Sequence, residues 1–119
     1  MPKHRACLFL AVLLTLALFL LGHTELAIGL AKPPYDLLLH AAFFGFLALL
    51  IWYGSAYKTW LAFILVSILT IADEVVQLGI PGRVGSEKDA LAGIIGALIV
   101  LISLGLFKKF VFKSKHATK

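Results

Sequence analysis

Four long apolar runs constrain the fold of this chain more than any other feature of its sequence. They cover residues of about 6–22, 37–53, 60–78 and 90–107. A helix needs about 20 mostly apolar residues to cross a membrane, because the hydrocarbon core is about 30 Å thick. Charged side chains make up 14% of the chain, against about 25% in soluble domains. The sequence therefore predicts an all-α, four-helix transmembrane bundle that forms a single domain over residues 1–119.

Short polar segments separate the four runs. The Pro33-Pro34 pair interrupts helical structure after the first run, residues 54–58 predict a tight turn, and Pro81-Gly82 predicts a turn before the last run. Four aromatic side chains flank the tight turn, as in the aromatic belts found at membrane surfaces: Trp52, Tyr53, Tyr57 and Trp60.

The distribution of Lys and Arg predicts the orientation of the bundle. Eight of the 11 lie at the N-terminus, at the 54–58 turn or in the basic tail 108–119. Because Lys and Arg are enriched on the cytoplasmic side, both termini are expected in the cytoplasm. Residues 73–89 would then lie at the extracytoplasmic face of the cell membrane. The net charge of +5 therefore indicates topology and no nucleic-acid partner.

A cleaved signal peptide is an alternative for the first run, but its length favours an uncleaved anchor.

Small residues predict which helix faces pack together. Gly93 and Gly96 recur on one face of the fourth run, and Ala41, Gly45 and Ala48 do so on the second run. Small residues at such spacing let helix backbones approach closely inside a membrane. We therefore expect the second, third and fourth helices to pack tightly and the first helix to be peripheral.

The stretch from Ala72 to Asp89 holds four of the six carboxylates in the chain. Glu74 is the strongest candidate, because an ionisable residue in a membrane helix usually faces the bundle interior or a water-filled cavity. It shares a predicted inward stripe with Ser67, Thr70 and Gln77, which recur every three or four residues. Asp73 lies 100° to one side of this stripe, so a place at the water interface is the alternative to a binding role.

Arg83 follows the Pro-Gly turn and presents a fork of donors suited to phosphate. An ion pair with Glu74 or Asp89 is the alternative. Arg83, Gln77 and Asp73 are therefore the candidate substrate-binding residues, and Glu74, His40 and Asp89 are the candidate catalytic residues.

His40 and Asp89 each have a structural alternative. His40 lies four residues after Asp36, whose carboxylate could fix the tautomer of the imidazole, although a packing role is open. Asp89 completes the pattern Ser86-x-x-Asp89, in which it would cap the start of the fourth helix.

Several kinds of site lack support in the sequence. C-x-x-C, H-E-x-x-H, G-x-S-x-G and P-loop motifs are absent, so the sequence does not support zinc-finger, metalloprotease, serine-hydrolase or nucleotide-binding sites, and any cofactor is unknown. The carboxylates and His40 carry atoms that can bind a divalent cation, but their spacing selects none, and no metal is assigned. The single cysteine, Cys7, excludes an intramolecular disulfide.

Three motifs together resemble the VanZ-like family of small bacterial membrane proteins. They are Asp36-x-x-x-His40, then Ala72-Asp73-Glu74-x-x-Gln77-x-x-x-Pro81-Gly82-Arg83, then Asp89-x-x-x-Gly93-x-x-Gly96. The resemblance covers nearly the whole chain and implies a compact helical membrane protein, with a link in some members to low-level resistance to the glycopeptide antibiotic teicoplanin. The family usually has Lys and Asn where this chain has Leu37 and Gly93.

Two classes of function follow. In the first, the protein acts at the extracytoplasmic face on an anionic lipid or lipid-linked glycan. Arg83 would hold the anion, Glu74 would serve as general acid or base, and His40 and Asp89 would orient it or move a proton. In the second, the chain is a non-enzymatic module that binds a wall precursor or an antibiotic, or escorts a membrane-protein partner or a second copy of itself. A transporter is a weaker alternative, because no inverted repeat is visible.

Overall fold

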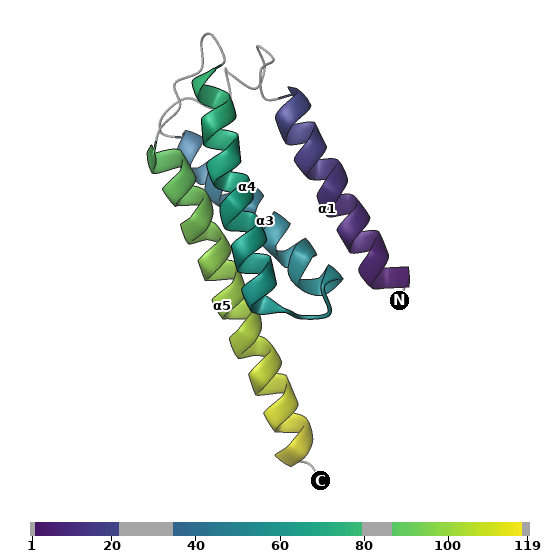
Figure 1. Cartoon of the computed structure of the whole chain (residues 1–119). Helices are drawn as coiled ribbons and strands as arrows, with labels where there is room; N and C mark the ends of the chain where they lie inside the picture. The colour runs from purple at the N-terminus through teal and green to yellow at the C-terminus, as the bar shows by residue number, and fades with distance from the viewer. Residues whose placement is uncertain (1, 22–34, 80–86, 118–119) are drawn as a thin grey trace.

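The computed structural model describes residues 2–21, 35–79 and 87–117 of the chain. Its elements are four α-helices: α1 (Pro2–Leu21), α3 (Tyr35–Gly54), α4 (Thr59–Leu78) and α5 (Glu87–Ala117). Each of them is long and apolar enough to cross a membrane. The predicted all-α fold with four spans is therefore confirmed (Figure 1).

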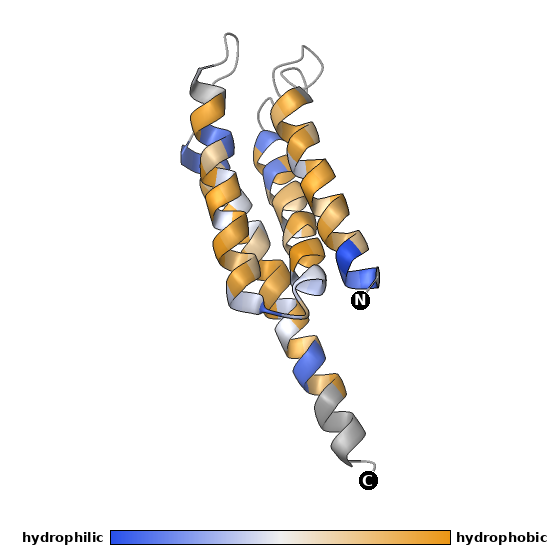
Figure 2. Cartoon of the chain, turned by 45° about the vertical axis from the view of Figure 1, so that its right-hand side comes forward, coloured by the Kyte–Doolittle hydropathy of each residue, from blue (hydrophilic) through white to orange (hydrophobic). Residues whose placement is uncertain are grey.

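The helices are apolar along most of their length, as Figure 2 shows in orange. Phe9, Trp60 and Ile99 are each more than 60% exposed, and many other large apolar side chains face outward. Such a surface is unfavourable in water but suits hydrocarbon, where the internal hydrogen bonds of each helix satisfy its backbone. The fold is therefore that of a multi-pass membrane protein.

Helix α3 forms the centre of the bundle and packs against each of the other three helices. Its Phe44, Leu47 and Ala48 are almost fully buried, together with Val66 of α4 and Ala97 of α5. The packing of α3 with α5 is the most extensive of all. The expected close association of the second, third and fourth helices is therefore confirmed.

Glycines bring α3 and α5 together. A Cβ added to Gly96 would overlap the backbone oxygen of Ala41 and would lie 2.7 Å from its Cα. A Cβ on Gly45 would lie 3.0 Å from Cγ2 of Val100. Larger residues at Gly96 would therefore force the two backbones apart, which explains why small residues recur on these faces.

Helix α1 lies at the side of the bundle, as expected. Ala11 is its one fully buried apolar residue among those whose burial is described. Helix α1 contacts the end of α3 through His4, whose ring Nδ1 is hydrogen-bonded to the carbonyl oxygen of Tyr53. Leu8 fills the space where Gly54 lacks a side chain, since a Cβ there would lie 2.6 Å from Cγ of Leu8.

The turn after α3 is a Schellman motif. The amide of Tyr57 donates to the carbonyl of Trp52 at 2.8 Å, and the amide of Ala56 donates to the carbonyl of Tyr53 at 3.2 Å. Ala56 occupies the left-handed position with φ of 57°. The rings of Trp52 and Tyr57 pack with centroids 4.9 Å apart, which is the apolar contact that commonly accompanies this motif. The expected tight turn is therefore present.

The ends of the helices divide between the two ends of the bundle. The N-terminus, the turn between α3 and α4, and the C-terminal part of α5 lie at one end (Figure 1). The last turn of α4 and the first turns of α3 and α5 lie at the other end. Residues 108–117, expected as a basic tail, continue α5 as a helix beyond the other helices.

Candidate functional site

Polar side chains gather where α3 and α5 begin and α4 ends. Figure 2 shows these hydrophilic positions in blue against the apolar length of the helices. They come from three helices that contact one another. The residues are Asp36 and His40 of α3, Asp73 and Glu74 of α4, and Glu87 and Asp89 of α5.

His40 is fixed in place by contacts at both ring nitrogens. Nδ1 lies 2.7 Å from the carbonyl oxygen of Asp36, and because a carbonyl can only accept, Nδ1 carries a hydrogen and donates it. Nε2 lies 3.4 Å from Oδ2 of Asp73. The backbone of Asp36 therefore orients the ring, whereas the sequence had suggested the Asp36 carboxylate. Because the backbone acceptor occupies Nδ1, Nε2 is the nitrogen that can exchange a proton, and Asp73 is its partner.

Asp73 is more deeply buried than expected. It is 4% exposed, and it directs a carboxylate oxygen at His40. The buried positions of α4 are Ala62, Val66, Thr70 and Asp73, which recur at intervals of four, four and three residues. Thr70 is therefore buried as expected, whereas Val66 and Asp73 occupy the inner positions expected for Ser67 and Glu74.

Glu74 lies beside this buried stripe and faces α5. Its Oε2 atom is buried and has no hydrogen-bond partner among the described residues. A carboxylate oxygen in that position is costly unless a donor reaches it. Glu74 also contributes to an open groove, of about 310 Å³, between α4 and α5.

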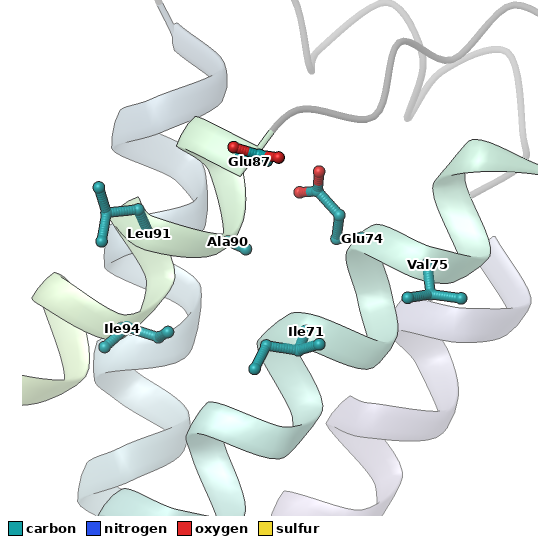
Figure 3. A pocket seen from close by; sticks show the side chains of 7 residues that line it. All are labelled: Ile71, Glu74, Val75, Glu87, Ala90, Leu91 and Ile94. Carbon is teal, nitrogen blue, oxygen red and sulfur yellow. The ribbon is translucent and has the colours of Figure 1, made fainter.

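The groove is lined by apolar side chains except at its acidic mouth. Figure 3 shows the carboxylates of Glu74 and Glu87 pointing toward one another across the gap between the two helices. The sequence alone gives Glu87 no role in the site, because a carboxylate in the first turn of a helix commonly stabilises the helix dipole. The remaining lining residues are Ile71, Val75, Ala90, Leu91 and Ile94.

Asp89 lies in the first turn of α5 and is 4% exposed. It is close enough to interact electrostatically with His40 and with Glu74. Asp89 therefore belongs to the same polar cluster. The capping arrangement expected for it involves Ser86, which lies outside the described residues.

Thr70 links α4 to the start of α5. Its hydroxyl donates to the carbonyl oxygen of Ala90 at 3.3 Å, and the residue is almost fully buried. A Cβ on Gly93 would overlap the Thr70 hydroxyl oxygen and would lie 2.9 Å from the Phe44 ring. Any larger residue at this position would force Thr70 or Phe44 to shift, so Gly93 has a packing role.

Two candidate residues cannot be placed. Arg83 lies outside the described residues. Gln77 lies in α4, but its side chain is outside the described part of the structure. The structure thus brings together His40, Asp73, Glu74 and Asp89 and leaves the expected anion-binding arginine as a prediction.

A metal centre has no geometric support in the described part of the chain. Within residues 2–21, 35–79 and 87–117, no three His, Cys, Asp or Glu side chains are arranged to hold a metal ion. The chemistry that the cluster can perform directly is proton exchange, because Nε2 of His40 and Oδ2 of Asp73 bond only when one of them carries a hydrogen.

Comparisons with protein-family models, with curated proteins and with solved structures found no match for this chain.

Proposed function

We propose that this chain is a cell-envelope membrane protein that acts on a lipid or a lipid-linked glycan at the end of the bundle where α4 and α5 form the groove. The observation that carries the proposal is the His40–Asp73 contact next to a carboxylate, Glu74, that lines an open groove. A ring held by a backbone carbonyl and a carboxylate is a common arrangement for moving a proton.

Each residue has a distinct role in this proposal. Glu74 meets the substrate in the groove and gives or takes a proton as general acid or base. His40 and Asp73 are positioning residues behind it, and Asp89 adds to the negative field around the ring. Arg83 would hold a phosphate of the substrate, a role that still rests on the sequence alone.

The membrane side and the family are part of the same proposal. The excess of Lys and Arg at the other end of the bundle favours an extracytoplasmic position for the site. The resemblance to VanZ-like proteins favours a place in cell-envelope metabolism with a link to glycopeptide resistance.

A second candidate function is non-enzymatic binding. The walls of the groove are apolar, and His40 and Asp73 are both nearly buried. These features suit a module that binds a wall precursor or an antibiotic, or escorts a partner membrane protein, without chemistry.

One experiment separates the two candidates. The purified protein in lipid nanodiscs is incubated with a panel of phospholipids and lipid-linked glycans, and products are followed by mass spectrometry. Turnover that is lost in Glu74→Gln and in His40→Gln supports an enzyme. Lys58→Gln, at the opposite end of the bundle, is the control and should keep full turnover. Binding of a panel member without turnover in any form of the protein would support the second candidate with a wall precursor as its ligand. Neither binding nor turnover would contradict both the enzyme and the binding of a wall precursor.

A further inference from the structure

The groove between α4 and α5 joins an apolar wall to an acidic mouth. The wall is formed by Ile71 and Val75 of α4 and by Leu91 and Ile94 of α5. The mouth is formed by Glu74 and Glu87 (Figure 3). A ligand that matches both parts has a hydrocarbon segment and a polar group attached at one end of it.

The groove is open to the lipid. Ile71, Val75 and Leu91 are each more than half exposed, and they belong to helices that can span the membrane. Glu74 lies two residues before the end of the apolar window of α4, which runs from Thr59 to Val76. The part of the wall formed by Ile71 and Ile94 therefore lies at hydrocarbon depth and the mouth lies nearer the headgroups, so a lipid can enter sideways without leaving the bilayer.

The two carboxylates at the mouth favour a cationic ligand. Two carboxylates that face one another repel, and the repulsion increases where water is scarce. No Lys or Arg is among the seven described residues that line the groove. An ammonium group placed between the two glutamates would donate to both carboxylates and would offset the repulsion.

We propose that the groove binds one zwitterionic aminophospholipid, with a primary ammonium held by Glu74 and Glu87 and an acyl chain lying along the apolar wall. A primary ammonium has three N–H donors, so one headgroup can bond to both carboxylates. A trimethylated headgroup of the same charge has no N–H donor and cannot form these bonds. The inference rests on the proposed function, since it names the lipid class for the same end of the bundle.

The test uses three photoactivatable phospholipids with the same acyl chain and different headgroups: ethanolamine, choline and glycerol. Each is added as a tracer to nanodiscs of one composition that contain the full chain, and crosslinked peptides of α4 and α5 are quantified by mass spectrometry. We expect the ethanolamine probe to label these helices about tenfold more than either of the others, because only it makes charge-assisted hydrogen bonds. Glu74→Gln and Glu87→Gln should each remove most of this preference, and Asp36→Asn, which lies outside the groove, should keep it.

Two results would overturn the inference. Equal labelling by all three headgroups would show that the groove accepts only a hydrocarbon chain. A preference that survives both Glu74→Gln and Glu87→Gln would place the headgroup elsewhere. Glu87 is exposed, so its variant tests the idea even where Glu74→Gln fails to fold.

Failure of the inference can be told apart from failure of the proposed function. His40 is not among the residues that line the groove, so His40→Gln should stop turnover and keep the ethanolamine preference. A preference without turnover in any form of the protein would leave the inference standing and contradict the enzyme. Turnover with no headgroup preference would support the enzyme and contradict the inference.

Discussion

The contact between His40 and Asp73 joins two polar side chains that are almost fully buried between apolar helices. Inside a membrane, such groups cost free energy unless each satisfies the other. The contact therefore serves the stability of the bundle as well as the chemistry proposed for it. Stability and activity can be separated by measuring both on the same variants.

Asp73→Asn is expected to destabilise the protein. The amide keeps the size of the side chain and removes the charge that faces Nε2 of His40. A buried polar group left with a poorer partner costs about 1–3 kcal/mol, so the thermal unfolding midpoint in detergent micelles should fall. Asp36→Asn is the control, since the backbone carbonyl that holds His40 remains. Equal loss in both variants would show that charge at this end of the bundle matters and the contact does not.

At the scale of whole helices, glycines determine how closely α3 and α5 pack. Gly96→Ala places a methyl group against the backbone of Ala41, and backbone cannot rotate away. Overpacking of this kind costs about 1–3 kcal/mol, so the variant should unfold at a lower temperature. Gly105→Ala is the matched control in the same helix, because a Cβ there meets nothing within 4 Å. It should stabilise α5 by about 0.5–1 kcal/mol. Similar effects of both substitutions would contradict the close packing of α3 with α5.

The turn between α3 and α4 offers a stabilising substitution. Ala56 has a φ of 57°, a conformation that costs a residue with a side chain about 1–2 kcal/mol relative to glycine. Ala56→Gly should therefore raise the unfolding midpoint. Ala42→Gly, at an exposed position within α3, should lower it, since glycine weakens a regular helix. If Ala56→Gly also lowered the midpoint, the left-handed conformation at this turn would be wrong.

The sequence predicted the number of helices and the close packing of α3 with α5, but it misplaced the inner face of α4. Lipid is as apolar as the core of the bundle, so hydropathy does not distinguish buried Val66 from exposed Ile68. Glycines reveal a packed face because their small size is needed only there. On α4 the sequence correctly predicted that Thr70 faces inward, but Val66 and Asp73 take the inner positions expected for Ser67 and Glu74.

At the scale of the whole molecule, the arrangement of the helix ends predicts which end of the bundle faces each side of the membrane. The termini and the turn at Lys58 share one end of the bundle, and Lys88 lies at the other end (Figure 1). Eight of the 11 Lys and Arg residues belong to the first end. The preference of such residues for the cytoplasm therefore predicts that the polar cluster and the groove lie outside.

Cysteine labelling tests this orientation. In a Cys7→Ser background, Lys58→Cys and Lys88→Cys are a matched pair of exposed positions at opposite ends. A membrane-impermeant maleimide should label Lys88→Cys in intact cells, and it should label Lys58→Cys only after permeabilisation, because the excess of positive charge holds that end inside. The reverse pattern would keep the bundle and place the groove in the cytoplasm, which would exclude action on extracytoplasmic substrates. Labelling of both positions in intact cells would contradict the spanning arrangement of α4.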